Sequence, residues 1–354
     1  MKGRVVVLGQ LRGREAAALI VDGTLEDLAI ETAQPGPGAL YRATVDRQMK
    51  GQGGVFVRLP EGARGFLRQA GGLRPGQSLL VQVSGHAEGG KAIPVTSRIL
   101  FKSRLAIVTP DAPGLNISRA IRDEGVLDEL RALAAAGMAD APESLGLILR
   151  TAAGDAPAAE VAEDIAAMRQ LAQAVLADSS GAPELLVDAP SPHELAWRDW
   201  SSPPPDDWAD AGDAFARHGV AEMIDALLSP ETPLPGGGSL VIEPTRALIA
   251  VDVNTGNDTS PAAGLKANIA AARALPRQLR LRGLGGQVVV DFAPFPKKDR
   301  HILDQALRAA FRAEATETTL AGWTPLGNFE LQRKRDRAPL AELLADPSPD
   351  LPAA

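Results

Sequence analysis

Two apolar segments decide the fold of the C-terminal part of the chain: ALIAVDVNTG at residues 247–256 and GGQVVVDF at residues 285–292. Each predicts a buried strand, and each carries an aspartate near its end, Asp252 in the first and Asp291 in the second. The stretch between them, residues 261–282, has the pattern of a helix. A strand–helix–strand crossover makes the two strands parallel, so we expect Asp252 and Asp291 to meet at one edge of a sheet.

The two aspartates suit a divalent cation. Mg²⁺ prefers oxygen ligands and is held by one or two carboxylates together with several waters. It polarises a phosphoryl oxygen and helps to generate the attacking hydroxide. Asn254 lies on the same face of its strand as Asp252, where it is expected to hold a phosphate oxygen or the attacking water. The alternative is that each aspartate caps a following helix or turn. Pro276 is expected to kink the intervening helix or to split it in two.

Charge is segregated along the chain. The formal net charge is −7, but residues 37–100 carry a net +6, residues 155–215 a net −11 and residues 266–312 a net +7. Local basic surface, rather than total charge, decides whether a polyanion docks. The two basic blocks therefore indicate nucleic-acid binding, with ordinary solvated faces as the alternative.

Residues 39–99 contain about five short strands separated by glycine-rich turns, which is typical of a small Greek-key barrel of the OB type. Phe56 and Phe66 each lie in one of these strands. Such barrels bind single strands with aromatic rings that stack on bases and with cations that follow the backbone. The alternative is that both phenylalanines fill the barrel interior. The cations around them are Arg42, Arg47, Lys50, Arg58 and Lys91.

The segments around the barrel have different patterns. Residues 1–36 have the pattern of strands, and residues 119–177 have helical periodicity, interrupted by a buried strand at residues 145–149. Arg150 and Thr151 end that strand, where a guanidinium and a hydroxyl are expected to face a phosphate. The alternative is an edge arginine paired with a neighbouring acid.

Residues 189–212 are rich in Pro and Asp and are expected to form a loop or linker without chemistry. Three tryptophans of this region are expected to serve packing, namely Trp197, Trp200 and Trp208.

Composition excludes several classes of protein. The chain has 354 residues, no Cys and 4 His, so disulfides, zinc–thiolate centres and cysteine nucleophiles are excluded and a multi-histidine metal site is not expected. No apolar run approaches the roughly 18 residues that span a bilayer, and the N-terminus lacks the pattern of a secretory signal. We therefore expect a cytoplasmic protein with no membrane partner.

Three strings in the C-terminal part closely resemble the catalytic region of bacterial ribonuclease E/G in order and spacing. They are AVDVNTG at residues 250–256, RQLRLRGLGG at residues 277–286 and VVDF at residues 289–292. Further likenesses extend across most of the chain, at residues 115–119, 147–152 and 326–335.

The resemblance implies an α+β fold of several subdomains. A reduced RNase-H-like subdomain is split between residues 1–36 and 177–219. The split encloses an inserted OB-fold RNA-binding domain at residues 37–100 and a 5′-sensor-like region at residues 101–176. A deoxyribonuclease-I-like α/β catalytic subdomain follows at residues 220–340, with a short tail at residues 341–354.

The resemblance also implies a metal-dependent endoribonuclease in RNA processing or decay, which cleaves single-stranded RNA by water attack on a phosphodiester and leaves 5′-phosphate and 3′-hydroxyl ends. Its metal ligands correspond to Asp252 and Asp291, with Mg²⁺ as the ion and Mn²⁺ as the alternative, and Asn254 completes the catalytic set. Its sensor for a 5′-phosphate corresponds to Arg150 and Thr151. The residues expected to bind RNA are Phe56, Phe66, Lys91, Arg277, Arg280, Arg282, Arg333 and Arg335.

The chain departs from the family pattern in several places. It has no Cys for the zinc link that joins protomers of relatives, so neither zinc nor a zinc-linked dimer is expected, while another oligomer stays open. We expect a short form of the family, without the long scaffold tail of larger relatives. Ser103 stands where the sensor of relatives has glycine, residues 316–318 lack a further sensor arginine, and residues 292–296 lack an acid that relatives often carry.

Three hypotheses follow from these residues. An active single-strand endoribonuclease comes first. The alternatives are a non-catalytic RNA-binding protein of the same family and a phosphoesterase that acts on another substrate.

Overall fold

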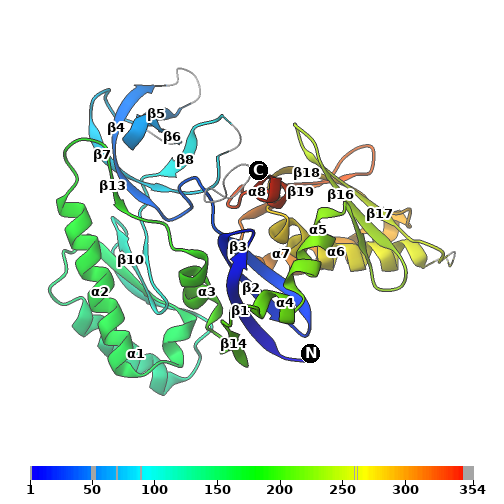
Figure 1. The fold of residues 1–354 in the computed structure, drawn as a ribbon, viewed down its shortest axis with the longest axis horizontal. Coiled ribbons are helices and arrows are strands. Elements are labelled where there is room, and N and C mark those ends of the chain that lie inside the picture. Colours follow the sequence, from blue (N-terminus) through cyan, green and yellow to red (C-terminus); the bar gives the residue numbers. More distant parts are fainter. Residues whose placement is uncertain are drawn as a thin grey trace. The chain divides into compact units, whose positions relative to one another are not determined.

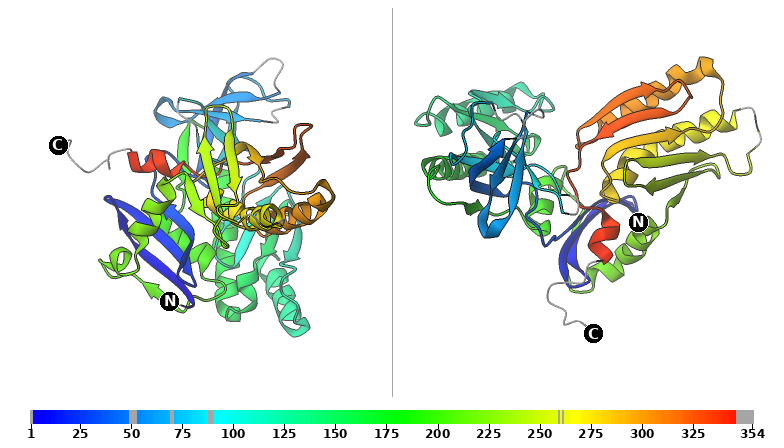
Figure 2. Two further views of the ribbon diagram at one scale, coloured as in Figure 1. Left: turned by 90° about the vertical axis from the view of Figure 1, so that its right-hand side faces the viewer. Right: turned by 90° about the horizontal axis from the view of Figure 1, so that it is seen from above.

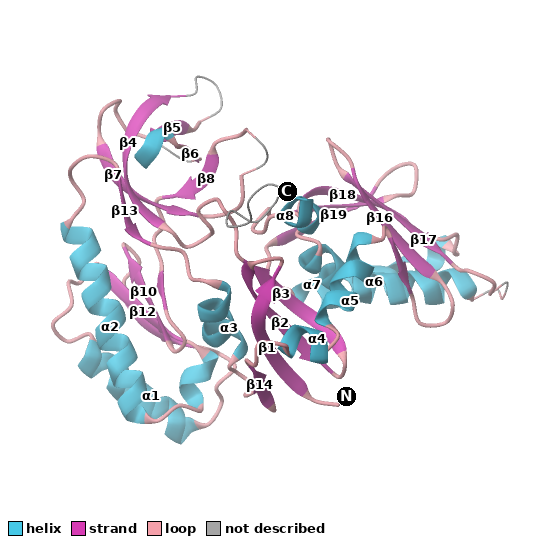
Figure 3. Ribbon diagram, viewed as in Figure 1, coloured by secondary structure: helices cyan, strands magenta, loops and turns pink. Residues whose placement is uncertain are grey.

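The computed structural model describes residues 2–48, 53–68, 71–87, 90–258, 260 and 262–345. The chain divides into two compact units, of which one is formed by Met1–Lys2, Val7–Ile30 and Ala209–Ala354 and the other by Gly3–Val6 and Glu31–Trp208. Figure 1 follows the chain through the elements of both units, and Figure 3 separates helices from strands. The chain therefore leaves the first unit after residue 30 and returns to it at residue 209.

A closed five-stranded barrel forms one part of the unit that contains residues 31–208. Its strands pair in the order β4-β5-β6-β8-β7, and β7 pairs with β4 to close the barrel. Alternate residues face inward, and Val45, Val57 and Val81 are fully buried there. The predicted OB-like barrel is therefore confirmed. The strands are β4 (Leu40–Gln48), β5 (Val55–Arg58), β6 (Arg64–Leu67), β7 (Ser78–Val83) and β8 (Ile93–Thr96), with the short helix η1 (Pro60–Gly62) between β5 and β6.

The other part of this unit is a sheet covered by two helices, in the order β11-β12-β10-β9. Asp123 caps α1 by accepting a hydrogen bond from the Val126 amide, and Val161 and Ile165 of α2 share a core with Leu147 of β12. The expected sequence of helix, buried strand and helix is confirmed. The elements are β9 (Phe101–Lys102), β10 (Ala106–Pro110), β11 (Gly114–Ile117), α1 (Glu124–Gly137), β12 (Leu145–Leu149), η2 (Thr151–Gly154), α2 (Ala158–Ala177) and β13 (Glu184–Val187), which pairs with β4.

The expectation that residues 189–212 form only a loop or linker is wrong. This region contains α3 (Pro192–Trp200) and β14 (Asp207–Ala209). Ser191 and Glu194 form a reciprocal capping box at the start of α3, which stabilises a helix end by satisfying two free backbone amides.

The packing role expected for the three tryptophans also needs a correction. Trp200 is buried as expected, but 55% of Trp197 is exposed. Its ring lies 5.4 Å from that of Trp208 and 5.5 Å from the Arg104 guanidinium. The ring of Trp197 therefore packs on one side and faces solvent on the other.

Most of an antiparallel sheet belongs to the other unit, whereas its residues 4–6 and 207–208 belong to the unit of residues 31–208. Its strands β1 (Arg4–Leu11), β2 (Arg14–Val21) and β3 (Thr24–Ile30) confirm the strands expected in residues 1–36, and β14 extends the sheet beside β1. The helices α4 (Ala214–Arg217) and α5 (Val220–Leu228) follow.

A six-stranded sheet in the order β15-β16-β17-β18-β20-β19 carries the predicted catalytic strands. Its helices α6 and α7 lie along one face (Figure 1, Figure 2), where Leu275 and Leu303 pack on Val251 and Val290 in one core. The opposite face bears the polar residues. The elements are β15 (Glu231–Pro233), β16 (Ser239–Pro244), β17 (Ile249–Asn254), α6 (Ala263–Leu281), β18 (Gly286–Asp291), η3 (Lys297–Asp299), α7 (Arg300–Arg312), β19 (Thr318–Trp323), β20 (Phe329–Arg333) and α8 (Leu340–Ala345).

The expectation that Pro276 splits the helix is wrong, because α6 runs without interruption from Ala263 to Leu281. Pro276 is buried in the face that packs on the sheet, and such packing outweighs the hydrogen bond that a proline removes. No helix in the described ranges combines the length and the apolarity needed to cross a bilayer.

Candidate active site

Asp252 and Asp291 lie directly opposite each other on neighbouring parallel strands. The register of β17 and β18 pairs Val251 with Val290 and Asp252 with Asp291. Both strands alternate buried and exposed residues, and both aspartates fall on exposed positions. Since neighbouring strands are about 4.8 Å apart, the two carboxylates share one patch of surface. The expected meeting of the two aspartates is confirmed.

Asn254 completes the cluster on the same face of β17. Its side-chain amide donates a hydrogen bond of 2.8 Å to Oδ2 of Asp252. Close backbone packing holds this end of the strand, since a Cβ on Gly256 would lie 2.0 Å from the Gly237 carbonyl oxygen and one on Gly238 2.4 Å from that of Asn254. The glycines of the turn before β16 therefore position the end of β17.

Two residues of α6 hold the segment that follows Asp291. Asn268 is fully buried and donates a hydrogen bond of 2.8 Å to the carbonyl of Ala293. A Cβ on Gly264 would lie 2.1 Å from the carbonyl oxygen of Pro294. Sequence reasoning missed both residues, although an asparagine and a glycine on the apolar face of a helix were a usable signal.

The structure gives no support to the capping alternative for the aspartates. The N-cap of α6 is Ala262 and that of η3 is Pro296, and neither helix start has a side-chain cap. Within the described residues, no group of three or more His, Asp or Glu side chains is placed to hold a metal. A pair of carboxylates nevertheless fits Mg²⁺, which usually keeps several waters and binds substrate phosphates in its other positions.

The stretch of residues 261–282 contains three arginines that the sequence predicted to bind RNA. Two of them instead bind other residues of the protein, which corrects the prediction. Arg280 donates hydrogen bonds of 2.5 Å each to Glu26 and Glu314. Arg282 is buried and donates to the Ser229 carbonyl at 2.6 Å, and burial lowers the pKa of its guanidinium. Arg277 lies 3.7 Å from Glu26 and keeps a third of its side chain exposed.

The same correction applies to Arg333 but not to Arg335. Arg333 is 2% exposed and lies 3.7 Å from Glu314, and burial lowers the pKa of its guanidinium. Arg335 is exposed, and its guanidinium covers Gly286 so closely that a Cβ there would lie 2.3 Å from one of its nitrogens. Arg335 therefore remains a candidate for contact with RNA.

Phe56 and Phe66 form an aromatic pair on the outside of the barrel. They are direct cross-strand neighbours, and their ring centroids lie 5.3 Å apart. Val55 and Val57 on either side of Phe56 point into the barrel core, whereas both phenylalanines are half-buried. The alternative that they fill the barrel interior is therefore wrong.

The surroundings of this pair fix its position. The Arg47 guanidinium lies 5.3 Å from the centroid of Phe56, and a Cβ on Gly54 would lie 2.5 Å from the Phe66 ring. Lys91 is exposed just before β8, while Lys50 lies outside the described residues. Arg42, by contrast, is buried and pairs with Asp178 and Glu184.

We predict that Phe66→Ala weakens binding of single-stranded RNA about tenfold, because each stacked base contributes ~1–3 kcal/mol. Fluorescence anisotropy with a labelled oligonucleotide measures the effect. Leu115→Ala is the matched control, since Leu115 is an exposed apolar residue of the same unit. Equal affinities of the Phe66 variant and the wild type would exclude the aromatic pair from RNA binding.

Arg150 and Thr151 make contacts within the protein. Arg150 donates hydrogen bonds to the Ser103 carbonyl at 2.6 Å and to Asp199 at 2.7 Å. The hydroxyl of Thr151 lies 2.8 Å from that of Ser118. The arrangement matches the alternative of an arginine paired with a neighbouring acid, and the 5′-sensor role of the two residues stays a prediction.

Asp199 is surrounded by cations. Besides Arg150, Lys102 and Arg198 each reach its carboxylate at 2.8 Å. Burial alone would raise the pKa of Asp199, but the hydrogen bonds and charges of Arg198 and Lys102 hold it well below its usual range. Asp199 therefore stays ionised and neutralises part of this cationic cluster.

Known proteins resemble the chain over most of its length. Residues 101–207 and 206–336 match the model of the Ribonuclease E/G family. Ribonuclease E of a Nostoc species is 29% identical over 95% of this chain and 56% of its own length. Ribonuclease E of a Synechocystis species is 28% identical over 95% of this chain and 58% of its own length. Ribonuclease G of Escherichia coli K12 is 27% identical over 94% of this chain and 80% of its own length.

These relatives differ from the chain in extent. The chain spans little more than half the length of the two ribonuclease E relatives. The family model nevertheless covers both the sheet with the Arg150 region and the sheet with the Asp252–Asp291 pair. The chain belongs to the Ribonuclease E/G family.

Proposed function

We propose that the chain is an endoribonuclease that cleaves single-stranded RNA in a metal-dependent reaction. The main support for the proposal is a single observation. In this chain, which belongs to the Ribonuclease E/G family, Asp252 and Asp291 lie opposite each other on parallel strands, on the exposed face of a sheet. Two carboxylates on an exposed surface repel a polyanion unless a cation lies between them. The pair therefore makes sense as a metal-dependent site for phosphate chemistry.

The residues of the site have separate roles in this proposal. Asp252 and Asp291 hold Mg²⁺, or Mn²⁺ in its place, and the ion supplies charge stabilisation at the phosphoryl oxygen. The Asn254 amide orients Asp252 and binds a phosphate oxygen or the attacking water. Water adds to phosphorus and gives up a proton, the bond between phosphorus and the 3′ oxygen breaks, and that oxygen takes up a proton. The products are a 5′-phosphate and a 3′-hydroxyl.

The barrel supplies affinity for unpaired RNA in this proposal. Phe56 and Phe66 present a half-buried aromatic pair beside Arg47. Such a pair stacks on bases that a duplex would keep covered by their neighbours. Single-stranded RNA is therefore the proposed substrate class, and Lys91 is the proposed cation beside the pair.

The finer assignments belong to the same proposal. These are the likeness of the split N-terminal part to RNase H, the likeness of residues 220–340 to deoxyribonuclease I, the use of magnesium and a cytoplasmic location. Zinc has no thiolate ligand in the chain, because the chain has no Cys.

The test is cleavage of an internally labelled single-stranded RNA with Mg²⁺ and with EDTA, with 5′-monophosphate and 5′-hydroxyl versions of the substrate. We expect cuts only with Mg²⁺, and products whose 3′ ends a polymerase extends. The same sequence in a duplex is the control and should resist cleavage. Binding without any cut would favour the non-catalytic RNA-binding alternative. Cleavage in EDTA would contradict the metal site.

A further inference from the structure

The turn between β19 and β20 lies at the same edge of the sheet as the two aspartates. Val290 of β18 pairs with Phe329 of β20, so Asn328 falls next to Asp291, one strand away. Thr324 is joined to Asn328 across the turn by a backbone hydrogen bond of 2.7 Å. Because neighbouring strands are about 4.8 Å apart, this turn borders the carboxylate pair.

The turn presents one large apolar side chain to solvent. Leu326 at its tip is 94% exposed. The turn is nevertheless rigid, since the Gly327 amide donates to the Thr324 carbonyl at 3.0 Å and the Asn328 amide to the Thr324 hydroxyl at 3.1 Å. Gly327 has a φ of 103°, a conformation that favours glycine. Leu326 is therefore held out from a fixed backbone rather than from a loose loop.

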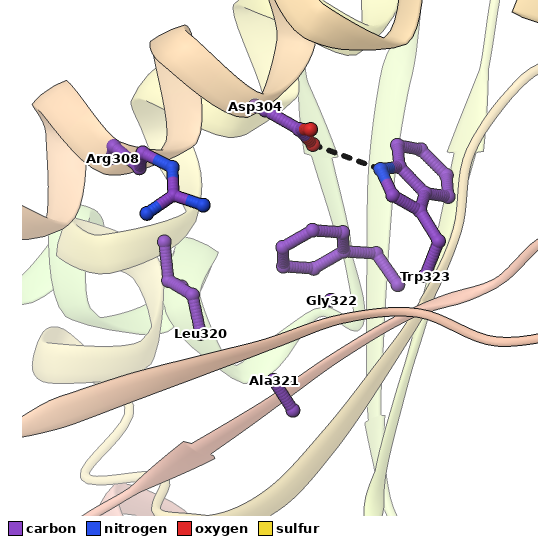
Figure 4. A pocket seen from close by; sticks show the side chains of 7 residues that line it. Asp304, Arg308, Leu320, Ala321, Gly322 and Trp323 are labelled. Carbon is purple, nitrogen blue, oxygen red and sulfur yellow. Dashed lines mark hydrogen bonds between the residues drawn. The ribbon is translucent and has the colours of Figure 1, made fainter.

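Side chains of α7 anchor the strand that leads into this turn. The Trp323 indole donates a hydrogen bond of 2.8 Å to Asp304, and the two residues line one pocket with Arg308 (Figure 4). The Arg300 guanidinium lies over the Trp323 ring, 4.4 Å from its centroid. The ring also packs on Phe292, the residue after Asp291, with 5.7 Å between ring centroids. The turn and the aspartate are thus tied to one aromatic cluster.

Cations flank the same edge. Lys297 and Lys298 are exposed in η3, six and seven residues after Asp291. The position of a Cβ on Gly327 lies 3.6 Å from a guanidinium nitrogen of Arg300. A nucleotide combines an apolar base face with a charged phosphate. The apolar tip of the turn suits the base, and the neighbouring cations suit the phosphate.

We propose that Leu326 is a substrate-positioning residue, which packs against an unpaired nucleobase next to the scissile phosphate. The inference rests on the proposed function of the Asp252–Asp291 pair. Apolar side chains insert between base steps and unstack them, and a base already free of pairing meets Leu326 without that cost. Arg300, Lys297 and Lys298 attract the phosphates on either side. The turn thus adds a selection for single strands at the point of cleavage.

The absence of Cys from the chain allows a direct test. Leu326→Cys provides a unique thiol, which is labelled with a benzophenone and photo-crosslinked in EDTA to the RNA used for cleavage. The control is Leu228→Cys, since Leu228 is an exposed leucine of the same unit. We expect a crosslink from position 326 to a nucleotide adjacent to the cut, and none above background from position 228. Equal crosslinking from both positions, or none from 326, would overturn the proposal.

A second measurement separates positioning from general binding. Leu326→Ser should raise KM for single-stranded RNA about tenfold, because the apolar contact with the base is lost, and should leave the melting temperature unchanged. Leu326→Phe should keep KM close to that of the wild type because it retains an apolar surface. An unchanged KM in Leu326→Ser would overturn the proposal. If RNA crosslinks to position 326 but the protein never cleaves RNA, RNA binds at the turn and the proposed endoribonuclease activity is refuted. Failure of the Leu326 proposal is therefore distinguishable from failure of the proposed function.

Discussion

Asp252→Asn and Asp291→Asn should each abolish RNA cleavage while RNA binding stays largely intact. The substitution keeps the size of the side chain and removes the negative charge that holds a divalent cation. We expect the cleavage rate to fall by at least ~100-fold, the scale of losing one group that stabilises transition-state charge. Both aspartates are exposed, so the fold does not depend on them. Initial rates on single-stranded RNA, with affinities by anisotropy, measure the two effects.

Glu243→Gln is the matched control for this pair of variants. Glu243 is an exposed residue of β16 and pairs with Ala250 of β17. Ala250 lies two residues before Asp252, so Glu243 is on the same face of the sheet as Asp252. Glu243→Gln removes one negative charge from this face of the sheet and leaves the two proposed metal ligands unchanged, so cleavage should persist. Undiminished cleavage by either aspartate variant would refute the site assignment.

Arg280→Met should destabilise the unit that contains residues 209–345 by about 3–5 kcal/mol, the cost of breaking a buried ion pair by removing one partner. The side chain of Glu314 is completely buried, and Arg280 lies 2.5 Å from it. Arg333 lies 3.7 Å from the same carboxylate, and, against the effect of burial, the charge of Glu314 also helps to raise the pKa of the Arg337 guanidinium. Without Arg280 the buried Glu314 carboxylate loses its 2.5 Å ion pair, which is shorter than its contact with Arg333, so its charge is compensated less well. Urea unfolding followed by circular dichroism measures the change.

Arg273→Met is the control for Arg280→Met, because Arg273 is an exposed residue of the same helix. Its loss should change the free energy of unfolding by no more than about 0.5 kcal/mol. A similar, small effect of both substitutions would show that Arg280 is not part of a buried network, and would return it to the candidates for RNA contact.

The position of the carboxylate pair could be predicted from sequence because it depends on local periodicity. Alternation along a strand places Asp252 and Asn254 on one face, and a helical crossover makes the flanking strands parallel. The exact register, with Asp252 opposite Asp291, depends on how α6 packs, and Pro276 inside that helix gave the opposite signal. Tertiary packing outweighed the local preference there.

The roles of the arginines could not be predicted in the same way. A count of charges along residues 266–312 shows a basic block but not the partners of its members. Arg280 pairs with Glu26, which lies 254 residues earlier in the chain. Arg282 is buried against the Ser229 carbonyl, 53 residues earlier. Ion pairs at such separations appear only when the fold is known, so basic residues were overcounted as RNA contacts.

The helix α3 was missed for a different reason. The prolines and aspartates of residues 189–212 favoured a loop, and the composition of the segment outweighed a short capping signal. Ser191 and Glu194 stand three residues apart, which is the spacing of a capping box, and the structure contains that box. The exposed Leu326 was also beyond sequence reasoning, because its position beside Asp291 depends on the pairing of β18 with β20.

The most direct test of the metal site is electron paramagnetic resonance of Mn²⁺ added to the wild type, Asp252→Asn, Asp291→Asn and Glu243→Gln in the presence of single-stranded RNA. The measurement reports bound ion independently of cleavage. We predict one bound Mn²⁺ in the wild type and in Glu243→Gln, and its loss in both aspartate variants. Unchanged Mn²⁺ binding in the two aspartate variants would contradict the assignment of Asp252 and Asp291 as the metal ligands.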